Sequence, residues 1–233
     1  MNKRKSLHIS YGIVILVFLV SLTFGSRVVT TFVESQPPER TVCLVLDAGH
    51  GGLDGGATSC TGKLESAFNL EITLTLRDLF HLLGYQTKMV RTTDSSVYTK
   101  GDTIAQKKVS DLKERVRIVN ETEKPILISI HQNNFTDSRY SGAQVFYAKT
   151  PGSEDLAKSL QNAFLATINP GSHRNIKKSH GIYLMDHVYC PAVLIECGFL
   201  SNPAEEAKLR DPKYQRQIAC VIASTLSTYL SNT

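Results

Sequence analysis

The sequence lacks the features that mark several large classes of protein. It has no internal repeat, no low-complexity segment, no HExxH motif and no pair of cysteines at a CxxC spacing. It also lacks a basic region in its globular part. Residues 1–40 carry five basic and two acidic side chains, a net charge of +3, which leaves +2 of the total of +5 for residues 41–233. Such a nearly neutral domain argues against nucleic-acid binding.

Cysteine is scarce, with five residues in the whole chain. An odd number at irregular spacing argues against a disulfide framework. Cys43, Cys197 and Cys220 stand in apolar runs, so we expect them to be small buried hydrophobic side chains. The sequence leaves room for one disulfide, using Cys60 or Cys190, if the domain is exported.

One long hydrophobic run is present, and it lies near the N-terminus. Basic residues at 3–5 precede an apolar stretch at 9–24, which is the pattern of a secretory signal. The run is a little shorter than the ~20 residues of a comfortable membrane span. We therefore expect export, with either a cleaved signal peptide or a retained anchor. The expected segments are a signal or anchor (1–26), a linker (27–40) and one globular domain (41–233).

Downstream of the linker, strand and helix patterns alternate. Apolar runs predict strands at 41–47, 85–90, 125–131, 143–148, 181–185 and 192–196, and helical spacing predicts helices at 65–83, 107–122, 153–168 and 211–230. Gly84 stands at a helix C-terminal position, and Ser153 is a candidate N-cap. The alternation predicts a single α/β domain, with a mostly parallel central sheet of about six strands and helices on both faces.

Side chains that can bind metal stand at the ends of separate predicted strands. His50 follows the first strand, His131 ends the third, Glu196 ends the last, and Glu65 begins a helix after the Gly-rich loop HGGLDGGATSCTG (50–62). Functional groups collect at the carboxyl ends of strands in open α/β sheets, so these four can meet. Two imidazoles and one carboxylate form a common catalytic zinc set, and a second carboxylate can carry protons.

Three nearby polar residues each have two interpretations. Asp47 could orient His50 by accepting a hydrogen bond, or it could cap backbone amides at the strand end. Asn133 could bind substrate or serve as a turn residue. Arg115 could support the site by binding substrate or orienting a ligand, or it could form an ion pair on a helix surface or clamp a loop.

At these residues the sequence resembles the zinc-dependent N-acetylmuramoyl-L-alanine amidases of the type-3 family. The resemblance covers about residues 41–230. Its motifs are LDAGHGGLDGGA (46–57), LESAFNL (64–70), RTTD (91–94), LKERVRIVN (112–120), ISIHQNN (128–134) and PAVLIECGFLSNPAEEAKL (191–209). The chain departs from the family at Ala48, Ser66 and Gln132, where proline, lysine and alanine are usual, and none of these positions is a ligand.

The resemblance implies a reaction and a set of roles. One Zn²⁺ per chain would be held by His50, Glu65 and His131, and Glu196 would be the catalytic general base and acid. The bond cut would be the amide between the lactyl group of N-acetylmuramic acid and L-alanine of the peptidoglycan stem peptide. Two rival functions remain open at this point. They are a zinc peptidase or deacetylase acting on the same polymer, and a non-catalytic peptidoglycan-binding protein.

The size, the single N-terminal apolar segment and the lack of wall-binding modules resemble the spore-cortex amidases of endospore formers. Those enzymes act during sporulation, on the way to muramic δ-lactam. The resemblance implies peptidoglycan as the substrate and a location outside the cytoplasmic membrane, such as the space between the forespore and mother-cell membranes. It also implies membrane attachment if the N-terminal segment is uncleaved. Some clostridial members need a lipoprotein, so a lipoprotein activator is an expected partner.

Overall fold

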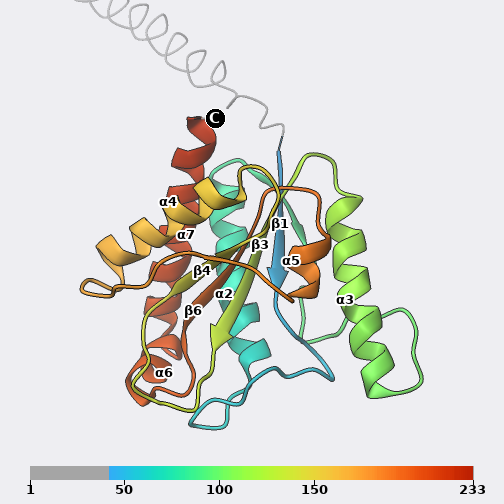
Figure 1. The fold of residues 1–233 in the computed structure, drawn as a ribbon, viewed down its shortest axis with the longest axis horizontal. Helices are drawn as coiled ribbons and strands as arrows, with labels where there is room; N and C mark the ends of the chain where they lie inside the picture. The colour runs from blue at the N-terminus through green and yellow to red at the C-terminus, as the bar shows by residue number, and fades with distance from the viewer. Residues whose placement is uncertain (1–41, 233) are drawn as a thin grey trace, which may run out of the picture. The chain divides into compact units, whose positions relative to one another are not determined.

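Six strands form one sheet in the computed structural model, which describes residues 42–232 (Figure 1). The strands are β1 (Cys43–Ala48), β2 (Gln86–Met89), β3 (Pro125–Asn133), β4 (Gln144–Tyr147), β5 (Lys177–Lys178) and β6 (Ala192–Phe199). Their order in the sheet is β2-β1-β3-β6-β4-β5, and every pairing is parallel except that of β4 with β6. The predicted α/β class and mostly parallel sheet of about six strands are confirmed.

Helices cover both faces of this sheet, as predicted (Figure 1). One face carries α2 (Glu65–Leu82), α4 (Ser153–Thr167) and α7 (Pro212–Ser231), the other carries α3 (Ile104–Asn120) and α5 (Tyr183–His187), and α6 (Pro203–Leu209) follows the carboxyl end of β6. Side chains of a strand alternate between faces, so β1 contributes Leu46 to one core and Val45 to the other. Burial on both faces explains why β1, β3 and β6 are nearly continuous apolar runs.

The segment 181–185 was predicted as a strand, and this prediction is wrong. It belongs to the short helix α5, which begins at Tyr183. Leu184 and Met185 are adjacent in sequence, and both are buried in the core that residues of α3 also line. A strand would direct neighbouring side chains to opposite faces of the sheet. The sixth strand is instead β5, whose two residues are exposed lysines.

The start of one helix and the cap of another differ from the prediction. α3 begins at Ile104 rather than 107, because Thr103 and Gln106 form a capping box. α4 is capped by Gly152 in a left-handed conformation, not by Ser153. The Ser153 hydroxyl instead accepts a hydrogen bond from the backbone amide of Ala192 at 2.9 Å, which ties α4 to the start of β6.

All five cysteines are free thiols, so the structure contains no disulfide among residues 42–232. Cys197 is buried as expected, whereas Cys43 is half-buried. Cys220 is exposed on α7, so its expected burial is wrong. The predicted signal or anchor (1–26) and linker (27–40) lie outside the described residues. Across residues 42–232, none of the helices has the length and apolar character that a membrane span requires.

Candidate metal and catalytic site

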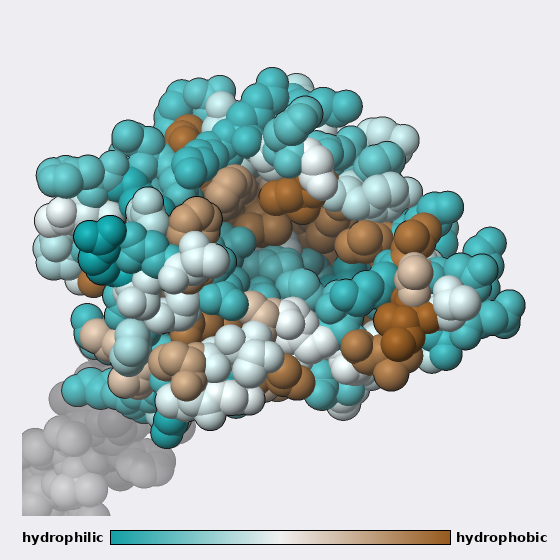
Figure 2. Space-filling model, turned by 60° about the horizontal axis from the view of Figure 1, so that its bottom comes forward, coloured by the Kyte–Doolittle hydropathy of each residue, from teal (hydrophilic) through white to brown (hydrophobic). Residues whose placement is uncertain are grey.

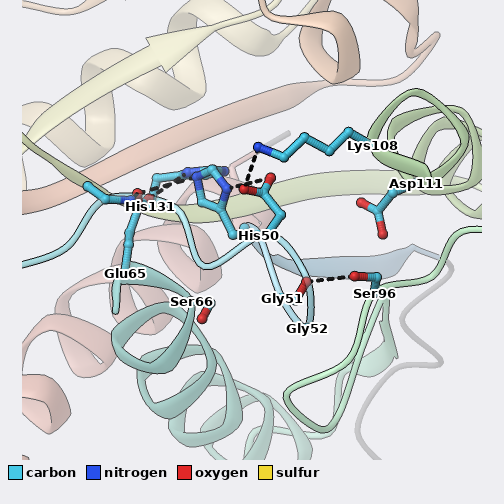
Figure 3. A network of polar contacts seen from close by, with 12 residues as sticks. His50, Gly51, Gly52, Glu65, Ser66, Ser96, Lys108, Asp111 and His131 are labelled. Carbon is cyan, nitrogen blue, oxygen red and sulfur yellow. Dashed lines mark hydrogen bonds and ion pairs between the residues drawn. The ribbon is translucent and has the colours of Figure 1, made fainter. Parts of the chain in front are cut away.

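Two histidines and a glutamate meet where β1 and β3 end, on the lower rim of the sheet in Figure 1. His50 lies on the Gly-rich loop after β1, His131 lies in β3, and Glu65 is the first residue of α2. One side-chain donor atom from each residue lies within 4.8 Å of the others. Glu65 stands between the rings, with Oε2 3.3 Å from Nε2 of His50 and Oε1 3.0 Å from Nδ1 of His131 (Figure 3).

The carboxylate of Glu65 is fixed by neighbouring amides. Only 4% of the residue is exposed. The backbone amides of Ala57 and Gln132 donate to it at 3.0 and 3.2 Å, and the side-chain amide of Asn69 donates at 3.2 Å. Burial opposes ionisation, but the two imidazoles outweigh it and hold the pKa of Glu65 well below its usual range. Glu65 is therefore ionised, as a metal ligand must be.

His50 occupies an unusual backbone conformation. Its φ is 60°, in the left-handed region, and its carbonyl accepts a hydrogen bond from Nη2 of Arg115 at 2.7 Å. Its Nδ1 lies 3.0 Å from Oδ2 of Asp54. Burial alone would lower the pKa of His50, but Glu65 and Asp54 raise it to about 9. Carboxylates that draw a proton to this ring would equally stabilise a metal cation beside it.

Two buried arginines contact the backbone at the end of β1 and at the start of the Gly-rich loop. Arg115 is 3% exposed and donates to the carboxylate of Asp47 at 2.5 Å and to the Ala48 carbonyl at 3.1 Å. Arg91 donates to the same carbonyl at 2.8 Å and to the Gly49 carbonyl at 3.0 Å. These contacts of Arg115 are those of a loop clamp, and its predicted contact with substrate stays a prediction.

Asp47 does not take the place beside His50 that the sequence suggested. Its two carboxylate oxygens bind Arg115 and the hydroxyl of Ser129, the latter at 2.6 Å. Burial opposes its ionisation, but Arg115 and Ser129 together lower its pKa. The acceptor beside Nδ1 of His50 is Asp54, four residues further along the same loop.

Two glycines leave the space that the side chains of His131 and Glu65 occupy. A Cβ at Gly49 would lie 2.1 Å from Nε2 of His131, which is impossible without displacing the ring. A Cβ at Gly56 would lie 2.6 Å from Oε2 of Glu65, and its φ of +69° also favours glycine. The Gly-rich loop is thus packed against all three donor side chains.

Glu196 lies on β6 in register with His131 on β3, so the two side chains share one face of the sheet. Its Oε2 is buried and has no hydrogen-bond partner among the described residues. Burial raises the pKa of Glu196 to about 7, and the charge of Glu65 adds to this while the two imidazoles oppose it. A carboxyl group with such a pKa can both accept and release a proton near neutral pH.

A cavity of about 330 Å³ opens at these residues and is lined by His50, His131 and Glu196. Its walls come from the Gly-rich loop, α3 and the start of α5, and they are largely apolar. Figure 2 shows a hollow on the lower face of the molecule with hydrophobic residues along its rim. Asn133 is not among the lining residues, and its backbone carbonyl accepts from the amide of Leu200 at 2.7 Å. Its predicted contact with substrate stays a prediction.

Sequence reasoning missed Asp54, Arg91 and Ser129 as parts of the site. All three stand in the motifs LDAGHGGLDGGA, RTTD and ISIHQNN, but their partners could not be assigned from the sequence. Arg91 contacts the Ala48 carbonyl and Ser129 contacts the Asp47 carboxylate at the end of β1, and only the folded chain brings these residues together.

Comparisons with known proteins agree with this geometry. The family model described as N-acetylmuramoyl-L-alanine amidase matches residues 44–228. The germination-specific N-acetylmuramoyl-L-alanine amidase of Bacillus subtilis (strain 168) is 36% identical over 99% of this chain and 96% of its own length.

Two solved structures share the fold at substantial identity. The CwlD amidase of Clostridioides difficile, solved in complex with the GerS lipoprotein, has a TM-score of 0.79 at 39% identity, over 82% of this chain and 99% of that one. An N-acetylmuramoyl-L-alanine amidase from Clostridium difficile 630 has a TM-score of 0.71 at 30% identity, over 82% and 97%. A match across nearly the whole domain, in sequence and in structure, identifies this chain as a member of the N-acetylmuramoyl-L-alanine amidase family, whose reaction it catalyses.

Proposed function

We propose that this amidase uses a zinc ion held by His50, Glu65 and His131, with Glu196 as its proton carrier. The observation that carries the proposal is the meeting of three donor atoms within 4.8 Å beside a fourth group, Glu196, whose buried oxygen has no partner. Three ligands and an open position are the usual composition of a catalytic zinc site.

The donor set fits zinc better than the other common divalent metals. Two imidazole nitrogens and one carboxylate oxygen suit zinc, whereas magnesium and calcium prefer oxygen ligands alone. Zinc ligands are usually oriented by hydrogen bonds from neighbouring residues. Here Asn69 contacts Glu65, and Asp54 contacts His50.

The residues of the chain would divide the chemistry as follows. Zinc supplies Lewis acidity, which lowers the pKa of bound water from ~15.7 towards ~7 and polarises a carbonyl. Glu196 accepts the proton of the water that attacks the lactyl carbonyl of N-acetylmuramic acid. It then delivers this proton to the departing nitrogen of L-alanine. The pKa of about 7 suits Glu196 to both transfers.

Digestion of purified muropeptides tests this proposal. The protein is stripped of metal, divided, and incubated with and without added zinc, and the products are read by mass spectrometry. A free lactyl carboxylate together with a stem peptide that begins at L-alanine is expected only with zinc. A shortened stem peptide would indicate a peptidase, and loss of acetyl groups a deacetylase. Full activity in the metal-free sample would contradict the zinc proposal.

We further propose a role in the spore cortex. The support is the match to the germination-specific amidase of Bacillus subtilis, which spans 96% of that protein. Expression of this chain in a Bacillus subtilis strain that lacks its own germination-specific amidase should restore muramic δ-lactam to the cortex. Spores that still lack the lactam, although the protein is present and active on muropeptides, would contradict this role.

We also propose that the protein is exported and that it has a lipoprotein partner. Peptidoglycan lies outside the cytoplasmic membrane, and the basic, apolar start of the sequence is typical of an export signal. The CwlD amidase was solved with the GerS lipoprotein, and it is 39% identical to this chain. Co-purification of this chain with a lipoprotein from spore-forming cells would support a partner. Full activity of the isolated chain would show that no activator is required.

A further inference from the structure

The imidazole of His50 is held differently from that of His131. His131 belongs to β3, whose pairing with β1 extends to Ile130 and whose pairing with β6 includes His131 itself, so the sheet sets its position. His50 lies on the Gly-rich loop in a left-handed conformation, so its ring depends on side-chain contacts for orientation. One of these is Glu65, which faces Nε2, and the other is Asp54, which faces Nδ1.

Asp54 meets the chemical need of a histidine that binds a metal through Nε2. A neutral imidazole carries one proton, and the metal takes the nitrogen without it. With Nε2 directed to the ion, the proton must stand on Nδ1 and needs an acceptor. An ionised carboxylate at 3.0 Å can only accept, so Asp54 selects this tautomer and fixes the plane of the ring.

Asp54 is itself held in place by two further sets of contacts. Its backbone amide and carbonyl pair with those of Gly51, at 3.2 and 2.7 Å, across the turn that follows His50. Its second carboxylate oxygen, Oδ1, lies 2.9 Å from Nζ of Lys108 on α3. Figure 3 shows Lys108 reaching from α3 towards the His50 loop.

Folding stability does not account for this pair, because Lys108 is 51% exposed and such surface ion pairs contribute little. We propose that Asp54 is a positioning residue for His50, and that Lys108 tethers it, so that α3 becomes part of the support of the metal site. This inference rests on the proposed zinc function. It assigns Asp54 no contact with substrate, and its effect is on metal affinity.

Zinc affinity measured by competition with a chromophoric chelator tests the inference in the full chain. Asp54→Ala should raise the dissociation constant for zinc about 10–100-fold, as losses of outer contacts do. Asp54→Asn keeps an acceptor oxygen and should raise it less. Lys108→Gln should give a smaller rise than Asp54→Ala. The matched control is Lys113→Gln, an exposed lysine of the same helix outside the cavity, which should leave the constant unchanged.

Two further readouts separate positioning from a merely structural role. The melting temperature of the zinc-free protein should stay close to that of the wild type in all four variants. With excess zinc, the kcat of Asp54→Ala should recover towards the wild-type value. The inference would be overturned if the dissociation constants for zinc of Asp54→Ala and Asp54→Asn were no higher than that of Lys113→Gln. The inference would also be overturned if both Asp54 variants raised this dissociation constant and also lowered the melting temperature of the zinc-free protein.

The same titration includes His131→Ala, which separates this inference from the proposed function. If wild type and His131→Ala bind zinc equally weakly, the proposed zinc site itself fails. If His131→Ala loses zinc while both Asp54 variants keep wild-type affinity, only the positioning role fails.

Discussion

The site has two halves that are positioned by different physical means. The sheet half consists of His131 and Glu196, which stand in register on the paired strands β3 and β6. The loop half consists of His50 and Glu65, which flank the Gly-rich loop and are fixed by side-chain hydrogen bonds, two buried arginines and close glycine contacts. Backbone pairing thus places one half, and a network of polar side chains places the other.

This difference indicates which substitutions should disturb each half of the site. A strand residue keeps its place as long as the sheet persists, so substitutions in the sheet half remove one chemical group and little else. A loop residue keeps its place only through its partners, so substitutions outside the three-residue donor cluster can disturb the loop half. The predictions below test this contrast, from the largest expected effect to the smallest.

Loss of His131 is expected to have the largest effect. His131→Ala removes one of three donors, so both zinc binding and amide hydrolysis should be abolished. The measurements are bound zinc per chain and release of stem peptide from muropeptides. His81→Ala is the control, because His81 is an exposed histidine on α2 that contacts Thr87. Retention of zinc by His131→Ala would show that the three residues do not share one ion.

Loss of Glu196, the proposed proton carrier, should slow turnover strongly without loss of metal. Glu196→Gln keeps the shape of the side chain but cannot accept a proton, so kcat should fall ~10²–10⁴-fold. Bound zinc should stay at the wild-type level, because Glu196 is outside the donor cluster. Near-normal hydrolysis by Glu196→Gln would mean that another group carries the proton.

The loop half should respond to a residue that contacts no metal. Arg115→Met leaves the buried Asp47 carboxylate without its cation and frees the carbonyl of His50. Removing one partner of such a buried pair destabilises by ~3–5 kcal/mol. Chemical denaturation measures this change. Arg117→Met is the matched control, because Arg117 pairs with Glu114 on the exposed side of the same helix and should change stability little.

If Arg115→Met and Arg117→Met gave equal unfolding midpoints, the loop would not depend on its buried arginine. The distinction between the two halves would then be lost.

The smallest effect concerns pH and the zinc-free protein. The pKa of Glu196 is raised from 4.5 to about 7 by burial. Between these values the folded state keeps a proton that the unfolded state has released, so the free energy of unfolding falls as pH rises. Glu196→Gln lacks this titration, and its stability relative to wild type should improve by at most ~1.4 kcal/mol per pH unit across this range. Parallel pH curves for the two proteins would contradict the raised pKa.

The sequence predicted the sheet half better than the loop half, for a physical reason. Strands buried on both faces are continuous apolar runs, so β1, β3 and β6 and the residues at their ends could be located without a structure. His131 and Glu196 inherit their proximity from these strands. The meeting of His50 and Glu65 with them was also expected, but the contacts that hold the loop were not.

The missed features depend on tertiary contacts. Asp47 and Asp54 are both acidic residues near His50, and nothing local decides which one faces the ring. Arg115 decides it, because it reaches Asp47 from a helix more than sixty residues away. The conformation of α5 also depends on tertiary contacts. Its short apolar run fits a strand or a helix equally well from the sequence, and the packing of its residues against α3 favours the helix.

The two outer strands of the sheet have a consequence for self-association. The strands at its two ends, β2 and β5, have four and two residues, and they carry Lys88, Lys177 and Lys178. Short, charged border strands offer few free backbone groups to another chain and repel a copy of themselves. The folded domain is thereby guarded against edge-to-edge aggregation with copies of itself.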